Sequence, residues 1–222
     1  MPKYVYLSFP LGLSDPRPPA IPAPELAPLY TIAKDGAGVH TLKVASHTGT
    51  HVDAPCHVIQ GGVPITAFAP EELIFTRPVV VDLRAGDDEV VRPELLQPHE
   101  RALQHADLAL LRFGYGAVRR TEPERFSQHC PGLGVDAARW LRLNFPDLRA
   151  LGMDVPSLAC IAHLDQTMAA HNELLGGAGC CFLVIEDMDL NHDLDGLDEV
   201  RLCPWLVQGM DSSPCSIVGV YR

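Results

Sequence analysis

Residues 47–57 have the sequence HTGTHVDAPCH, which places three histidines and one aspartate within eleven residues. Imidazole nitrogens and carboxylate oxygens are ligands that divalent transition metals take in proteins. Surface segments rarely gather so many of these groups in so short a span. We therefore predict a metal site that includes His47, His51, Asp53 and His57.

The backbone of this stretch is predicted to be extended or a loop. Gly49 and its β-branched neighbours are poor helix formers, and Pro55 keeps the residue before it out of the helical region. Alternate side chains of an extended chain face the same way, so the three histidines and Asp53 would share one face until the chain bends at Pro55. Gly49 on that face would leave room for a metal or substrate to approach the backbone.

The composition indicates a globular protein. The chain has 222 residues, 47% of them hydrophobic, and no low-complexity linker divides it, so we expect a single domain over residues 1–222. A net charge of −11 with only 17 Lys and Arg argues against a nucleic-acid partner. Without a signal peptide or a membrane-spanning stretch, we expect a cytoplasmic protein with no membrane partner.

The chain has seven cysteines but no Cys-x-x-Cys pair, so neither a disulfide framework nor a thiolate zinc site is indicated. Cys56 beside His57 raises a second hypothesis, a thiol nucleophile activated by imidazole. Neighbouring side chains of an extended segment point to opposite faces, which argues against that pair. Loss of activity with a chelator would indicate the metal enzyme, and loss with iodoacetamide the thiol enzyme. A metal-binding protein without catalytic activity is the third possibility.

Strands alternate with a few helices along the chain, which predicts a mixed or β-rich α/β fold. The Pro-rich stretch from Pro10 to Pro28 is expected to be irregular and to lie over a site as a lid. Strands are predicted at 4–9, 39–45, 79–83, 108–113, 148–153, 180–185 and 216–221. Helices are predicted at 93–106 with an interruption at Pro98, at 135–145 and at 164–175.

Two further residues are candidates for the same site. His171 follows Leu164 and Met168 on the predicted apolar face of the helix over 164–175, and Glu186 follows a uniformly apolar strand. A carboxylate out of water needs a cation or several hydrogen-bond donors, and a metal provides the cation. His171 and Glu186 are therefore predicted to complete the site begun by residues 47–57.

The stretch at 47–57 resembles the His-x-Gly-Thr-His-x-Asp-x-Pro-x-His signature of the metal-dependent cyclase family, to which bacterial kynurenine formamidase belongs. Three more segments resemble the family's motifs in the same order: GMDVPS at 152–157, HNELL at 171–175 and GMDSSP at 209–214. The resemblance covers essentially the whole chain. One departure is that His171 and Glu186 lie fifteen residues apart, further than in the family pattern.

The resemblance implies a β-rich domain of the swivelling β/β/α type, assembled as a homodimer or higher homo-oligomer. It implies that His47, His51 and Asp53 hold one metal ion. Asp53 and Glu186 would bridge to a second ion that His171 also holds, and His57 would act as the acid and base. The cofactor would be one or two divalent ions, with zinc expected first and manganese second.

The activity implied by the resemblance is hydrolysis of an amide C–N bond. An arylformamidase converting N-formylkynurenine to kynurenine and formate in tryptophan catabolism is the first expectation. The alternative is opening of a cyclic amide or lactone, such as an isatin-like ring. We would look for the walls of the pocket that takes this small amide substrate among the Pro-rich segment, Phe9, Phe68 and Trp205.

Overall fold

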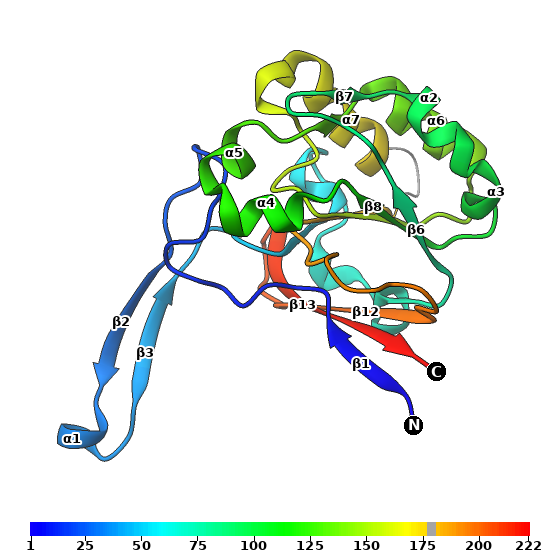
Figure 1. The fold of residues 1–222 in the computed structure, drawn as a ribbon. Helices are drawn as coiled ribbons and strands as arrows, with labels where there is room; N and C mark the ends of the chain where they lie inside the picture. The colour runs from blue at the N-terminus through cyan, green and yellow to red at the C-terminus, as the bar shows by residue number, and fades with distance from the viewer. Residues whose placement is uncertain (177–180) are drawn as a thin grey trace.

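The main sheet of the protein combines parallel and antiparallel strands (Figure 1). The structure, a computed structural model, describes residues 1–176 and 181–222. Within these residues the sheet has nine strands in the order β5-β12-β13-β4-β11-β10-β8-β6, with β1 also paired to β13. Their bounds are β1 (Lys3–Tyr6), β4 (His51–Asp53), β5 (Ile74–Phe75), β6 (Pro78–Asp82), β8 (Leu108–Arg112), β10 (Ala150–Met153), β11 (Leu183–Glu186), β12 (Glu199–Pro204) and β13 (Ser212–Tyr221).

Strands β6, β8, β10 and β11 run parallel, and the helices in the connections between them cover one face of the sheet. These helices are α2 (Pro93–Leu96), α3 (Glu100–Leu103), α4 (Tyr115–Thr121), α5 (Pro123–Gln128), α6 (Val135–Asn144) and α7 (Leu164–Leu175). A 3-10 turn, η4 (Gln97–His99), separates α2 from α3 at the predicted interruption. A small parallel pair, β7 (Val90–Val91) with β9 (Gly132–Leu133), lies beside them. No helix within the described residues is long and apolar enough to cross a membrane.

Strands β8, β10 and β11 are buried on both faces, as their largely apolar sequences predict, whereas the edge strand β6 is only partly buried. On β8, Ala109 and Leu111 pack in a cluster with the helices, whereas Leu108 and Leu110 pack in a second cluster with Val200 of β12. Figure 1 shows α2, α6 and α7 on one side of β8, and β12, β13 and β1 on the other. The resulting β/β/α layers confirm the predicted α/β fold class.

Strand β4 lies between β11 and β13 and is antiparallel to both. In this register His51 is paired with Glu186, and Asp53 with Val184 and Ser212. Because β4 is a central strand, all three of its residues are buried. A three-residue strand thus places His51 and Asp53 on one face, next to the end of β11.

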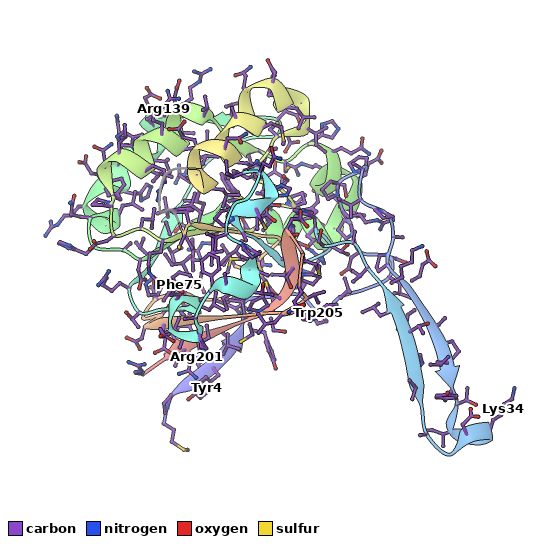
Figure 2. All side chains as sticks on the ribbon, turned by 180° about the vertical axis from the view of Figure 1, so that it is seen from behind. Tyr4, Lys34, Phe75, Arg139, Arg201 and Trp205 are labelled. Carbon is purple, nitrogen blue, oxygen red and sulfur yellow. The ribbon has the colours of Figure 1, made fainter. Side chains whose placement is uncertain are left out.

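A two-stranded hairpin extends away from the body of the molecule (Figure 2). It pairs β2 (Glu25–Tyr30) with β3 (Val39–Lys43), and the short helix α1 (Ile32–Asp35), with Lys34, forms its tip. The predicted strand at 39–45 corresponds to β3, but β2 overlaps a stretch that was predicted to be irregular. Pro28 is compatible with a strand here because a two-stranded sheet has only edge strands. Every residue of β2 and β3 is exposed.

Helix α7 has the predicted bounds but buries a different face. Leu164 and Met168 were predicted to face the core, yet both are more than 40% exposed. The buried residues are instead Thr167, Ala170, His171, Leu174 and Leu175. The prediction that His171 points inward is confirmed, and Met168 is free to line a cavity. The strand predicted at 180–185 corresponds to β11, and Cys180 lies outside the described residues.

Candidate metal centre

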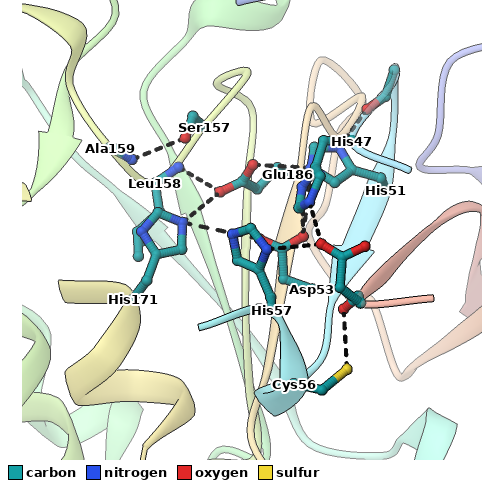
Figure 3. Close-up of polar contacts among 12 residues, drawn as sticks. His47, His51, Asp53, Cys56, His57, Ser157, Leu158, Ala159, His171 and Glu186 are labelled. Carbon is teal, nitrogen blue, oxygen red and sulfur yellow. Dashed lines mark hydrogen bonds and ion pairs between the residues drawn. The ribbon is translucent and has the colours of Figure 1, made fainter. Parts of the chain in front are cut away.

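The six predicted site residues come together in one place (Figure 3). His51 and Asp53 belong to β4, Glu186 ends β11, and His171 lies on α7. The other two flank β4: His47 precedes it, and His57 ends the short 3-10 helix η1 (Pro55–His57) that follows it. The structure therefore joins the two halves of the site, which are more than a hundred residues apart in sequence.

Gly49 shapes the turn that leads into β4. Its φ of 62° lies in the left-handed region, which favours glycine. The carbonyl oxygen of Gly49 accepts a hydrogen bond from Nδ1 of His51 at 2.8 Å. Because Nδ1 is thereby the protonated nitrogen, Nε2 of His51 carries the lone pair that faces the site. The room predicted beside Gly49 is taken by Leu11, whose Cδ1 would lie 3.3 Å from an added Cβ.

Asp53 lies at the centre of the cluster. Nδ1 of His47 is 3.1 Å and Nε2 of His51 is 3.7 Å from its Oδ1, and Nε2 of His171 is 3.9 Å from its Oδ2. Both carboxylate oxygens are fully buried and have no hydrogen-bond partner among the described residues, and neither has Nε2 of His51. A buried carboxylate in this condition is costly unless a cation binds it. The donor set therefore fits a divalent metal.

Glu186 meets the same cluster from β11. Its Oε2 lies 3.1 Å from Nε2 of His51, and its Oε1 lies 3.5 Å from Nε2 of His171. The backbone N–H of Leu158 also donates to Oε1, at 2.6 Å. Burial by itself would raise the pKa of Glu186, but the two histidines outweigh it and hold that pKa well below its usual range. Glu186 thus reaches His171 despite the longer spacing in the sequence.

Three overlapping groups of described residues have ligand atoms within 4.8 Å of one another, the spacing of a metal site. One group is His47, His51 and Asp53, the predicted ligands of the first ion. Another joins Asp53 to His171, as predicted for the second ion, but its third member is His57 and not Glu186. Sharing of Asp53 between the two groups is compatible with one ion or with a bridged pair.

Asp211 is a site residue that the sequence prediction missed. It precedes β13, and its Oδ2 accepts hydrogen bonds from Nε2 of His47 at 2.9 Å and from Nδ1 of His57 at 3.0 Å. Burial opposes protonation of His47, but Asp53 and Asp211 outweigh it and raise the pKa of His47 to about 9. Asp211 stands inside the motif at 209–214, the one sequence signal that could have indicated it. The third of the metal-spaced groups is His47, His57 and Asp211.

The geometry at Cys56 does not support a thiol nucleophile. Its Sγ points to the carbonyl oxygens of Met210 and Asp211, at 3.6 and 3.8 Å, whereas the ring of His57 faces the side chain of Asp211. Burial and the charge of Asp211 raise the pKa of the Cys56 thiol. Both effects disfavour the thiolate that such an enzyme needs.

A cavity of about 350 Å³ opens onto the cluster. Its walls beyond the site residues come mainly from apolar side chains: Pro18, Ala20, Ile21, Pro156 and Met168. The predicted lid is therefore correct for part of the Pro-rich segment. Of the three aromatic residues suggested for the pocket, Phe68 is in the core, Phe9 packs against Arg119, and Trp205 is exposed on the surface.

Comparison with known proteins gives one family and several relatives. The model of the family described as "Putative cyclase" matches residues 5–159. Kynurenine formamidase of Bacillus cereus is 27% identical over 180 residues, which are 81% of this chain and 78% of that protein. Among solved structures, isatin hydrolase A from Labrenzia aggregata has a TM-score of 0.82 at 19% identity and covers 99% of this chain and 94% of its own. An isatin hydrolase bound to the product analogue thioisatinate has a TM-score of 0.80 at 20% identity. The match covers 100% of this chain and 93% of that chain.

Proposed function

The chain belongs to the cyclase family, and on that premise we propose that it is a metal-dependent hydrolase of an amide C–N bond. One observation carries the proposal: both carboxylate oxygens of Asp53 are buried among three histidines and make no hydrogen bond with the described residues. A divalent cation would satisfy them. His47, His51 and Asp53 would hold one ion, and His171 with Asp53 and Glu186 a second. Zinc is the expected metal and manganese the alternative.

A divalent ion held by these residues would lower the pKa of water toward neutrality and polarise the amide carbonyl. The chain itself supplies the orientation of its ligands. The Nδ1–H of His51 is fixed on the carbonyl of Gly49, so that Nε2 is directed at the centre. Glu186 is fixed in a similar way by the N–H of Leu158.

His57 is placed to move protons. Its Nδ1–H donates to Asp211, which leaves Nε2 of the neutral ring as a base, and the ring lines the cavity. Nε2 can take a proton as water adds to the amide carbonyl. The same proton then passes to the nitrogen as the C–N bond breaks, since an amide nitrogen leaves only when protonated. The products are a carboxylic acid and an amine, so formate is released from a formamide.

The proposed substrate is an arylformamide, with N-formylkynurenine first and a role in tryptophan catabolism. Support comes from relatives named kynurenine formamidase that align over about four fifths of this chain. One observation favours the alternative, a cyclic amide or lactone such as isatin. Among the described residues that line the cavity there is no Lys or Arg that could pair with the carboxylate of an amino acid. An uncharged ring would not require one.

An assay of purified protein on N-formylkynurenine, isatin and a simple lactone, with and without a strong chelator, tests the proposal. We expect chelator-sensitive hydrolysis that Zn²⁺ or Mn²⁺ restores. Ring opening without formamidase activity would favour the alternative substrate, and sensitivity to iodoacetamide instead of chelator would indicate a Cys-dependent enzyme. Bound metal without hydrolysis of any substrate would indicate a non-catalytic metal-binding protein.

We also propose a homo-oligomer, a dimer or larger, in which the β2–β3 hairpin contacts another copy. Two-stranded hairpins are marginally stable alone in water, yet this one exposes Leu26 and Leu42 as a cross-strand pair. A second copy would cover both side chains. The cytoplasmic location stays a prediction.

A further inference from the structure

Arg119 is a buried arginine beside the site to which the mechanism gives no part. It lies on α4, and its guanidinium forms a fork with Asp187, from Nε to Oδ1 at 2.7 Å and from Nη2 to Oδ2 at 3.0 Å. The same Nη2 donates to Oδ2 of Asp15 at 3.0 Å. The guanidinium carbon also stacks 4.1 Å from the ring centroid of Phe9. One side chain that is 7% exposed thus joins two distant carboxylates.

The Asp187 end of this arrangement is part of the metal centre's backbone. Asp187 follows Glu186 directly, and its φ of 53° is in the left-handed region that side chains other than glycine's rarely adopt. Its carbonyl accepts a hydrogen bond from Oγ1 of Thr50 at 2.5 Å, and its N–H donates to the carbonyl of Val155 at 2.8 Å. A conformation of this cost persists only when its surroundings hold it. The fork from Arg119 holds it together with the hydrogen bonds to Thr50 and Val155.

The Asp15 end is part of the cavity wall. Arg17 donates from Nη1 to the carbonyl of Asp15 at 2.9 Å and from Nε to the carbonyl of Ile21 at 3.1 Å, which ties the segment into a compact loop. Pro18, Ala20 and Ile21 of this loop line the cavity over the cluster. The loop has no strand or helix of its own at residues 15–21, so its position depends on such side-chain contacts.

We propose that Arg119 is a positioning residue: through Asp15 and Asp187 it fixes the apolar wall of the cavity against the strand end that carries Glu186. We name Arg119 with these two carboxylates the Arg119 bridge. The inference rests on the proposed function where it concerns substrate. The Asp15 half sets how tightly substrate is held, and the Asp187 half supports the metal ligand. Arginine suits this role because its planar fork bonds both oxygens of Asp187 while Nη2 also reaches Asp15, whereas a lysine ammonium makes no bidentate fork.

The experiment separates the two halves with variants of the full-length protein. Asp15→Asn removes the charge and keeps an acceptor oxygen. Asp15→Ala removes both the bond from Arg119 and the bond that Oδ2 accepts from the N–H of Gly12, while the fork to Asp187 remains. Asp136→Asn is the matched control, because Asp136 is an exposed partner of another arginine, Arg139, on α6. The first readout is KM and kcat on N-formylkynurenine and isatin, with metal content. The second is hydrogen–deuterium exchange at Ile21, whose N–H bonds to the carbonyl of Pro18 and does not touch Asp15.

We expect KM to rise about threefold in Asp15→Asn and about tenfold in Asp15→Ala, the range for a partly buried charge-assisted hydrogen bond. Metal content and kcat should stay at wild-type values, and exchange at Ile21 should rise about threefold or more. The control should match wild type. In Arg119→Lys, where both halves are weakened, metal affinity should fall as well.

Wild-type KM and wild-type exchange at Ile21 in Asp15→Ala would overturn the proposal. A fall in kcat with an unchanged KM in Asp15→Ala would also overturn it. The contact between Arg119 and Asp15 would then affect the chemical step and not the position of the cavity wall. If wild type hydrolyses neither substrate, the proposed function fails by itself. The exchange comparison still decides whether Arg119 holds the loop.

Discussion

The surroundings of Asp53 and His47 favour positive charge in the site. Asp53, Glu186 and Asp211 bring three carboxylates to one cluster, and these carboxylates raise the pKa values of His47 and His51 against the opposing effect of burial. The raised pKa of His47, about 9, is the clearest sign. A metal ion would replace the protons of these histidines, because metal-bound imidazole must be neutral.

Metal binding should therefore depend on pH. The pKa of His47 in the metal-free protein is raised from 6.5 to about 9, so His47 is protonated at pH 7.5 and must lose its proton when metal binds. The apparent affinity should rise about tenfold per pH unit up to about pH 9, with release of at least about one proton per binding event. Calorimetric titration with Zn²⁺ in buffers of different ionisation enthalpy measures that proton. Binding at pH 7.5 with no proton release would contradict this description of His47.

His57 and His51 should respond differently to replacement by alanine. His57→Ala should keep most of the bound metal and lower kcat about 10²–10⁴-fold, the usual contribution of an acid–base residue. His51→Ala should lose metal and activity together. Metal analysis beside steady-state kinetics separates the two outcomes. Equal loss of metal and activity in His57→Ala would make His57 a ligand, consistent with its place in two of the metal-spaced groups.

Asp211→Asn tests the residue that orients His57. The amide keeps an acceptor oxygen but loses the negative charge that strengthens the hydrogen bonds from His47 and His57. Activity or metal affinity should therefore fall about 10–100-fold, the range for partners of site histidines. The purified variant is compared with wild type for both quantities. Wild-type values for both would remove Asp211 from the site.

For individual residues, the sequence predicted six that the structure brings together, because their spacing and residue types indicate a metal site. It could not predict Asp211 or Arg119. Each is a single charged residue far in sequence from its partners. The motif at 209–214 contains Asp211 but does not show which residues it meets, and nothing in the local pattern distinguishes Arg119 from a solvated surface group. Their neighbours become known only when β13 and α4 are placed beside β4 and β11.

Among the elements, β4 shows how a very short strand can carry a site. Its three residues are held by strands on both sides, and the turn at Gly49 sets where it begins. The alternation of an extended chain was sufficient to predict that His51 and Asp53 share a face. The role of Gly49 was not predictable in the same way, because a positive φ depends on the turn and leaves no signal beyond the glycine itself.

Gly49→Ala should destabilise the metal-free protein by about 1–2 kcal/mol, the cost of a left-handed conformation with a Cβ. It should also weaken metal binding, because the Gly49 carbonyl orients His51. Gly196→Ala is the control, with a φ of 73° and open space around its Cβ position. Urea unfolding should show a similar loss in both variants, whereas only Gly49→Ala should bind metal more weakly. Unchanged metal affinity in Gly49→Ala would show that the turn does not orient His51.

Helix α7 and the β2–β3 hairpin mark the limits of prediction at the level of elements. The periodic apolar pattern gave the bounds of α7 but not its buried face: Leu164 and Met168 are exposed, and Met168 lines the cavity. The hairpin was missed in part because Pro28 and the prolines that precede β2 favour irregular structure. Neither strand has the alternation that one buried face would impose, since both faces are exposed.

On the scale of the whole molecule, the mixed sheet is what completes the site. Antiparallel pairing of β4 with β11 brings residues 51–53 to residues 184–186. The alternation of strands and helices predicted the α/β class, but the strand order required the structure, because β4 and β11 are neighbours that no local pattern connects. The β/β/α layers then leave the cavity between α7 and the Pro-rich loop.

The exposed hairpin leads to a prediction about assembly. Leu26→Lys combined with Leu42→Lys should convert a dimer or larger oligomer to a monomer, because like charges would replace an apolar cross-strand pair. Light scattering after size-exclusion chromatography measures the mass. Lys43→Gln, at an exposed ion pair on the same hairpin, is the control and should leave the oligomer intact. A monomeric wild type would contradict the proposed assembly.

The central claim is that these residues form a metal-dependent hydrolytic centre. The most direct test is to titrate Zn²⁺ or Mn²⁺ into metal-free protein while the hydrolysis of N-formylkynurenine and of isatin is followed. The account predicts that hydrolysis of at least one substrate rises from near zero and saturates at one or two ions per chain. Hydrolysis at full rate before any metal is added, or no hydrolysis at saturation, would contradict it.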